Sequence, residues 1–167
     1  MILGLSLAAF TNLHVVISLV AIAAGLWLCT AMINGRHLPG GAAFFLIATA
    51  LTSITGYFFP NAGVTPGQIV GGISLVALAL AAAALYAFEL RGYWRAVYII
   101  GSVLALYLNV FVGIVQSFQK IGPLARLAPT QSEPPFVIAQ VIGIGLAITA
   151  GWLAFRRFRR PPQLFAS

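Results

Sequence analysis

The stretch that decides the fold class is FVIAQVIGIGLAITAGWLAF, residues 136–155, which is followed directly by the basic run RRFRR, residues 156–160. An uncharged apolar segment of about 20 residues is long enough to cross the hydrocarbon core of a bilayer as one α-helix. A cluster of arginines directly after such a segment is typical of the cytoplasmic side of a membrane. The stretch therefore predicts a transmembrane helix whose C-terminal end faces the cytoplasm.

The rest of the chain has the same character. Its 167 residues are 61% hydrophobic and 7% charged, with a mean hydropathy of +1.03. A soluble domain is about one quarter charged, so this composition excludes a soluble globular protein. Four further apolar segments, separated by short turns rich in Gly and Pro, are long enough to span a membrane: residues 10–33, 40–59, 68–90 and 93–118.

These segments predict an all-α integral membrane protein. We expect residues 1–167 to form one transmembrane domain, a compact bundle of five transmembrane helices. The connections are short, so consecutive helices should pack antiparallel. The N-terminal apolar stretch continues far past the length of a signal peptide, and we expect it to belong to the first span.

Most of the basic residues fall on one side of the predicted spans. These residues are Arg36, Arg91, Arg95, Arg156, Arg157, Arg159 and Arg160. Lys120 and Arg126 fall on the other side. The positive-inside rule then places the N-terminus outside and the C-terminus in the cytoplasm, which predicts a multi-pass protein of a bacterial-type inner membrane.

The formal net charge of +7 is explained by the same placement. Four of the positive charges are Arg156, Arg157, Arg159 and Arg160, at the end of the last span. Arginines at this position are expected to contact the headgroups of anionic membrane lipids. We therefore expect lipids as partners and no nucleic-acid partner.

Small residues recur at the spacing of helix turns in three of the predicted spans. In lipid, such residues let helix backbones approach closely, so they predict helix–helix contacts. The contacts join helices of one chain, or they form the seam of a homodimer or of a larger membrane complex, and both interpretations remain open. The positions are Gly25, Gly67, Gly71, Ala139, Gly143, Ala147 and Gly151.

Polar side chains of several spans fall at similar heights in the outer half of the membrane. At about 1.5 Å per residue, Asn109 and Gln140 lie about 21 and 22 Å from the cytoplasmic boundary. Thr52 and Thr55 lie about 20 and 24 Å from it, and His14 lies about 30 Å from it, at the outer edge of the hydrocarbon. One further polar residue, Gln116, lies near the outer surface on the helical stripe of Asn109.

Two interpretations of these residues remain open. Buried polar groups in membranes lock helix pairs together by hydrogen bonds. Alternatively, the side chains form a polar pocket, open to the outer face, that binds a lipid, a quinone or a similar small amphipathic ligand. His14 and Gln116 would then lie at its mouth.

The longest loop, residues 119–135, is expected on the outer side above this layer. In one interpretation Gln131 and Glu133 form a lid that reaches His14. In the other, Glu133 and the prolines after it simply begin the last helix, with the carboxylate at its positive end.

Few residues are suited to catalysis or to metal binding. The chain has two acids, two histidines and one cysteine, Cys29, and it contains no motif of a known catalytic or zinc site. His14 and His37 are 23 residues apart, so they lie about 34 Å apart along a helix. A haem would need His14 of two subunits, or His14 and a different second ligand.

Three functions therefore remain open, and the cofactor is unknown. The first is a membrane protein that binds an amphipathic ligand or a partner through the outer polar layer. The second is a structural or accessory subunit of a larger membrane complex. The third is a haem-binding redox protein with His14 as an axial ligand.

Overall fold

The computed structural model describes residues 2–159, and nearly all of its regular structure is helical. Within this part of the chain, the residues outside the helices form one isolated bridge, between Ile2 and Leu5, and no strand. The helices are α1 (Leu7–Ile33), α2 (Pro39–Gly56), α3 (Pro66–Ala82), α4 (Trp94–Lys120), α5 (Gly122–Leu127) and α6 (Pro134–Arg157). A π-helical turn, η1 (Ala83–Ala87), extends α3.

Five helices are long and apolar enough to cross a membrane: α1, α2, α3 with η1, α4 and α6. The predicted all-α fold with five long apolar helices is confirmed. The remaining α-helix, α5, is only six residues long.

Side-chain caps explain why α1 and α3 begin earlier than the predicted spans. α1 begins at Leu7 because the Ser6 hydroxyl accepts a hydrogen bond from the backbone N–H of Ala9. α3 begins at Pro66 because Thr65 and Gln68 form a capping box, in which each side chain accepts from the backbone N–H of the other. α2 ends at Gly56, three residues before the predicted end.

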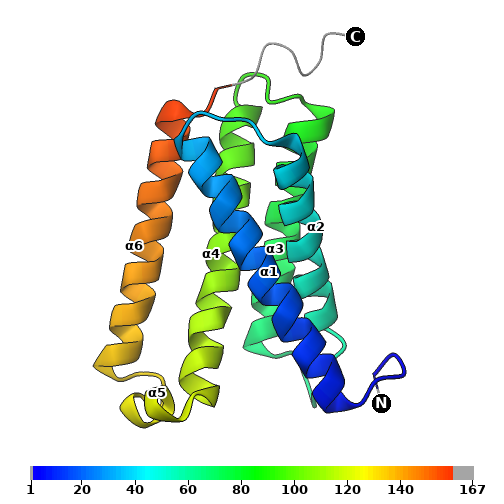
Figure 1. The fold of residues 1–167 in the computed structure, drawn as a ribbon, viewed down its shortest axis with the longest axis vertical. Coiled ribbons are helices and arrows are strands. Elements are labelled where there is room, and N and C mark those ends of the chain that lie inside the picture. The colour runs from blue at the N-terminus through cyan, green and yellow to red at the C-terminus, as the bar shows by residue number, and fades with distance from the viewer. Residues whose placement is uncertain (1, 160–167) are drawn as a thin grey trace.

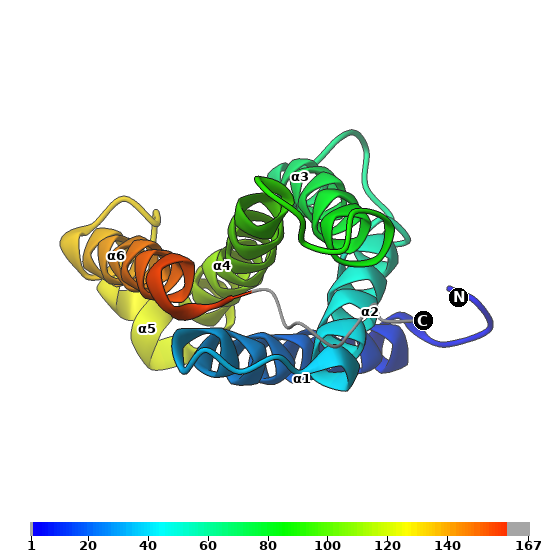
Figure 2. The same cartoon turned by 90° about the horizontal axis from the view of Figure 1, so that it is seen from above.

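α4 is the central helix of the bundle. It contacts all four other long helices, α1, α2, α3 and α6, whereas α1, for example, contacts mainly α2, α4 and α6. Figure 2 shows α4 between α3 and α6, with α1 crossing beneath it. α1 and α6 lie side by side where both helices end and diverge toward the opposite side of the bundle (Figures 1 and 2).

The core is concentrated in the half of the bundle where α4 begins. Most buried residues of α4 lie between Tyr98 and Leu106, whereas residues 107–115 are only half-buried and Phe118 is the one buried residue beyond them. Glycines allow the close packing in this core. A Cβ on Gly101 would lie 2.8 Å from the carbonyl oxygen of Ala77, so the backbones of α3 and α4 nearly touch there.

The predicted packing glycines take different positions. A Cβ on Gly25 would lie 2.6 Å from Leu106 Cδ1, so this glycine admits the side chains of neighbouring helices. Gly71 faces Tyr57 and Ser53, at the end of α2. Gly67 is exposed in the first turn of α3, and a Cβ there would meet only the hydroxyl of Thr65 of its own cap. Gly67 therefore makes no helix–helix contact within the described part of this chain, because α3 begins outside the packed part of the bundle.

The row of small residues on α6 faces the rest of the chain. A Cβ on Gly143 would lie 3.4 Å from Ile114 Cδ1, and a Cβ on Gly151 would lie 3.6 Å from Val103 Cγ1. Ala147 packs against the core and Ala139 is half-buried. The row is therefore covered by α4, although most of α6 is exposed.

Candidate functional site

The two ends of the bundle differ in charge. We call the end formed by residues 34–38, 88–93 and 157–159 the arginine end. We call the opposite end, formed by residues 57–65 and 121–133, the lysine end, after Lys120 in the last turn of α4. The predicted outer polar residues lie toward the lysine end.

His14 and Thr55 join α1 to α2 near the lysine end. The Nδ1 atom of His14 lies 2.8 Å from the Thr55 hydroxyl, which lies 2.7 Å from the carbonyl oxygen of Leu51. A hydroxyl has one proton, so Thr55 donates either to the carbonyl or to the ring. The Phe59 ring meets the His14 ring edge-on, with centroids 5.2 Å apart. The two residues predicted at similar heights are thus brought together.

Asn109 is paired with a threonine that was not predicted. Its amide donates to the hydroxyl of Thr49 over 3.4 Å, and Thr49 is fully buried. Thr52, one of the two predicted residues on α2, instead donates to the carbonyl oxygen of Ala48 within its own helix. Thr49 lies three residues before Thr52 on the same helix face, and this spacing is the sequence signal that could have found it.

Gln140 belongs to a third interface, between α6 and α4. Its amide donates to the carbonyl oxygen of Phe111 over 3.4 Å, and its own carbonyl oxygen Oε1 is buried without a hydrogen bond. No hydrogen bond among residues 2–159 connects Gln140 with Asn109 or with His14. The predicted polar layer is therefore divided among separate helix interfaces.

Gln116 is the exposed member of the predicted set. It lies seven residues after Asn109, so both side chains are on the same face of α4. Between them, a Cβ on Gly113 would lie 3.6 Å from Ile22 of α1, which shows that this face points into the bundle. Lys120 lies one turn beyond Gln116, in the last turn of α4.

The loop before α6 is held by its own hydrogen bonds. Gln131, with a φ of +60°, donates to the carbonyl oxygen of Val115 over 3.0 Å. The Glu133 carboxylate accepts from the backbone N–H groups of Thr130 and Ser132 and from the Thr130 hydroxyl. Desolvation raises the pKa of Glu133, but these hydrogen bonds together outweigh it and hold the pKa below its ordinary value.

The loop thus lies on the end of α4. Glu133 is the residue before α6, but its carboxylate turns back onto the Thr130 turn and does not cap the helix. Among residues 2–159, neither Gln131 nor Glu133 forms a hydrogen bond with His14. The loop is anchored to α4 and to its own turn, and its hydrogen bonds do not link it to the His14–Thr55 pair.

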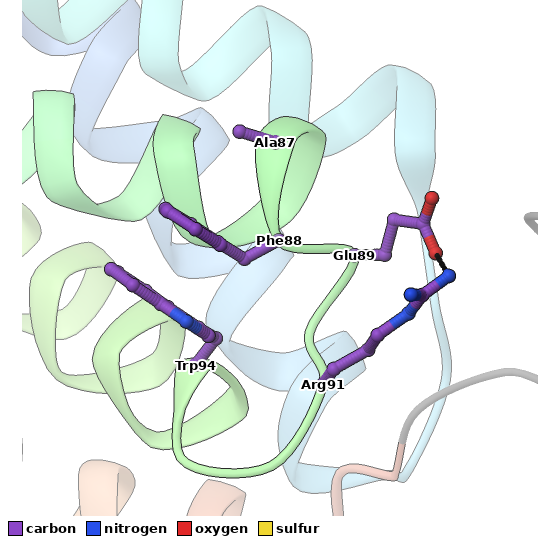
Figure 3. Close-up of a pocket in the computed structure, with 5 residues that line it drawn as sticks. All are labelled: Ala87, Phe88, Glu89, Arg91 and Trp94. Atoms are coloured by element: carbon purple, nitrogen blue, oxygen red, sulfur yellow. Dashed lines mark hydrogen bonds and ion pairs between the residues drawn. The ribbon is translucent and has the colours of Figure 1, made fainter.

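The arginine end has a strained turn that was not predicted. Glu89 and Leu90 have φ angles of +51° and +58°, and the backbone N–H of Leu90 bonds to the carbonyl oxygen of Ala84. The turn lines a hollow of about 220 Å³ with the rings of Phe88 and Trp94, which stack 3.7 Å apart (Figure 3). Because Arg91 forms an ion pair with Glu89, this hollow has little net charge.

Arg95 has a structural role that the charge count missed. Its guanidinium donates from Nη1 to the carbonyl oxygens of Phe155 and Phe158, over 2.9 and 2.8 Å. It also lies over the Phe155 ring, 4.7 Å from the centroid. Cations at a helix C-terminus satisfy its free carbonyl groups, so Arg95 attaches the end of α6 to α4.

The arrangement offers no preformed metal or two-histidine site. Among residues 2–159, no three side chains of His, Cys, Asp or Glu lie together in a way that could hold a metal ion. His14 lies toward the lysine end, whereas His37 lies at the arginine end beside Phe158, so one copy cannot place both on one haem iron. Comparisons with protein-family models, with curated proteins and with solved structures find no match to this chain.

Proposed function

We propose that the chain is a small polytopic membrane protein that binds one amphipathic ligand, a lipid, a quinone or a similar molecule, at the lysine end. The polar part of the ligand would lie beside His14, Gln116 and Lys120. Its apolar part would lie against the ends of α1, α2 and α4. The observation that supports this proposal most strongly is the position of Gln116. It is exposed on the same face of α4 as Asn109, which lies two turns deeper and donates a hydrogen bond to buried Thr49.

This observation supports a ligand because polar side chains within or beside the hydrocarbon are costly unless they have partners. Asn109 and Thr55 have hydrogen-bond partners in the protein. Gln116 lies on the same bundle-facing stripe of α4 as Asn109, but its side chain is exposed. The charge of Lys120, one turn after Gln116 on α4, favours a ligand whose polar part accepts hydrogen bonds or carries negative charge.

We also propose that the arginine end is cytoplasmic and the lysine end is outside, in a bacterial-type inner membrane. The arginines at the arginine end outnumber the basic residues at the lysine end, as the positive-inside rule requires of a cytoplasmic face. In this orientation, the proposed ligand site opens toward the outer leaflet.

Ligand-dependent thermal stabilisation of the purified protein tests the proposal. The probes are a short-chain ubiquinone and a lysophospholipid, each added to the protein in mild detergent. We expect His14→Ala and Gln116→Leu to lose most of the increase in Tm caused by the active probe. The matched control is Asn12→Leu, which changes an exposed amide two residues before His14 and therefore on the other side of α1. If all the variants keep the full increase, the polar residues only hold helices together and the proposal is wrong.

A structural subunit that docks through the small residues of α6 has less support. Gly143 and Gly151 face Ile114 and Val103 of the same chain, so α4 occupies that surface. The haem alternative needs a second axial ligand beside His14, and the other histidine, His37, lies at the opposite end of the bundle. An absorption spectrum before and after reduction by dithionite would show a shifting Soret band if a haem were present.

A further inference from the structure

The last turn of α6 lines a hollow of about 450 Å³ at the arginine end. Its wall consists of Trp152, Leu153, Arg156 and Arg157. The first two residues lie one turn before the two arginines, so apolar and cationic side chains face the same space. We propose that this hollow binds the phosphate headgroup of one anionic phospholipid of the inner leaflet.

The charge at this end of the molecule supports the proposal. The chain has only two carboxylate side chains, and Glu133 is at the lysine end. The other, Glu89, forms an ion pair with Arg91. Arg95 is bonded to the carbonyl groups at the end of α6. Among residues 2–159, therefore, no carboxylate forms an ion pair with Arg156 or Arg157, which face the hollow.

The geometry of the hollow orients these charges. The Arg156 guanidinium lies over the Trp152 ring, 4.8 Å from its centroid, and this cation–π contact limits the positions of the arginine. Arg95 fixes the backbone of the same turn to α4. The loop between α1 and α2 also packs there, since a Cβ on Gly35 would lie 3.2 Å from the carbonyl oxygen of Arg157.

A membrane lipid fits this hollow better than a free phosphate ion. Trp152 and Leu153 belong to the membrane-spanning part of α6, and Trp152 is exposed. Tryptophan is typical of the level of the lipid headgroups. A phospholipid can place its acyl chain against the apolar residues and its phosphate between the arginines, whereas a free ion would use the arginines alone.

Quenching of Trp152 fluorescence tests the proposal directly. The full chain with Trp27→Phe and Trp94→Phe keeps Trp152 as its only tryptophan, because the chain has three. It is placed in vesicles of phosphatidylcholine that contain a small fraction of brominated phosphatidylglycerol. We expect stronger quenching than with the same fraction of brominated phosphatidylcholine, and millimolar inorganic phosphate should not reverse it.

A pair of charge-matched variants separates a site from general attraction to the membrane. Each arginine that contacts the bound headgroup should contribute about a fivefold preference, so Arg156→Gln with Arg157→Gln should weaken the preference about 25-fold. The control, Arg36→Gln with Arg159→Gln, removes the same charge from the same end and should have a much smaller effect. Equal losses in the two variants would overturn the proposal, as would equal quenching by both brominated lipids or reversal by phosphate.

A second measurement covers the case in which the tryptophan variants do not fold. Native mass spectrometry of the otherwise unchanged protein should find one bound phosphatidylglycerol, which is lost in the Arg156→Gln, Arg157→Gln variant and kept in the control. Lipid adducts that follow the bulk composition of the membrane in all three proteins would contradict the site.

Discussion

Arg95 shows how a charged residue near a membrane boundary can have a structural role beside its topological one. Both its hydrogen bonds end on carbonyl groups of the last turn of α6. The sequence indicated only that Arg95 was on the basic side. Its partner could not be predicted, because Phe155 and Phe158 are 60 and 63 residues away and their carbonyl groups carry no sequence signal.

Removal of the Arg95 guanidinium should weaken the attachment of α6. Arg95→Gln is expected to lower the free energy of unfolding by about 1–3 kcal/mol, because it removes hydrogen bonds from a charged donor. Thermal unfolding in detergent measures the change. The control is Arg91→Gln, which removes an exposed ion pair and should cost less than about 1 kcal/mol. Equal effects would mean that Arg95 contributes only its charge.

The burial of His37 predicts that the stability of the protein depends on pH. Burial lowers the pKa of His37 from its ordinary value of 6.5, so the folded protein keeps the ring neutral at a pH where the unfolded chain binds a proton. The stability is therefore fully present above pH 6.5 and decreases as the pH falls toward the lower pKa of the folded state. His37→Phe should remove this part of the decrease in Tm between about pH 7.5 and about pH 5.5. An unchanged decrease in Tm would show that other titratable groups cause it.

At the scale of helices, the contacts depend on glycines at particular positions. A side chain at Gly25 would overlap Leu106 of α4 and Phe45 of α2. Gly25→Val should therefore destabilise the bundle by about 1–3 kcal/mol, as overpacked cores do. Gly67→Val is the matched control, because an exposed surface substitution should stay within about 0.5 kcal/mol. Comparable losses of Tm in the two variants would contradict the packing described for α1.

The helices themselves were predictable, whereas their rotation was not. Bilayer thickness sets the length of each apolar span, and Ser6, Thr65 and the prolines set the ends, so the sequence located the spans within a few residues. The five spans are apolar on nearly all sides, so no polar face shows which side points inward. Asn109 and Gln140 therefore appeared to share one layer by height, but they lie in different helix interfaces.

At the scale of the whole molecule, the difference in positive charge between the two ends predicts one orientation in the membrane. The only cysteine, Cys29, is buried, so Cys29→Ala gives a background for single-cysteine labelling. A cysteine in place of exposed Ala62, at the lysine end, should react with a membrane-impermeant maleimide in intact cells. A cysteine in place of exposed Tyr93, at the arginine end, should react only after the membrane is opened. The reverse pattern would contradict the proposed topology.

The division of the molecule into a closely packed arginine end and a more open lysine end links the proposals. The core and the Arg95 attachment lie toward the arginine end, where the proposed lipid site would fix the last turn of α6 in the inner leaflet. Gln116 lies on the less buried half of α4, where a ligand can approach without opening the core.

The measurement that tests the ligand proposal most directly is photocrosslinking from position 116. A photoreactive phenylalanine replaces Gln116 or, as the control, exposed Asn12 of α1, and the purified protein is irradiated and its intact mass determined. If the ligand site is at the lysine end beside Gln116, position 116 gives an adduct of one dominant small molecule, and position 12 does not. Adducts at both positions that mirror the bulk lipid mixture would contradict a specific site and leave the polar residues a purely structural role.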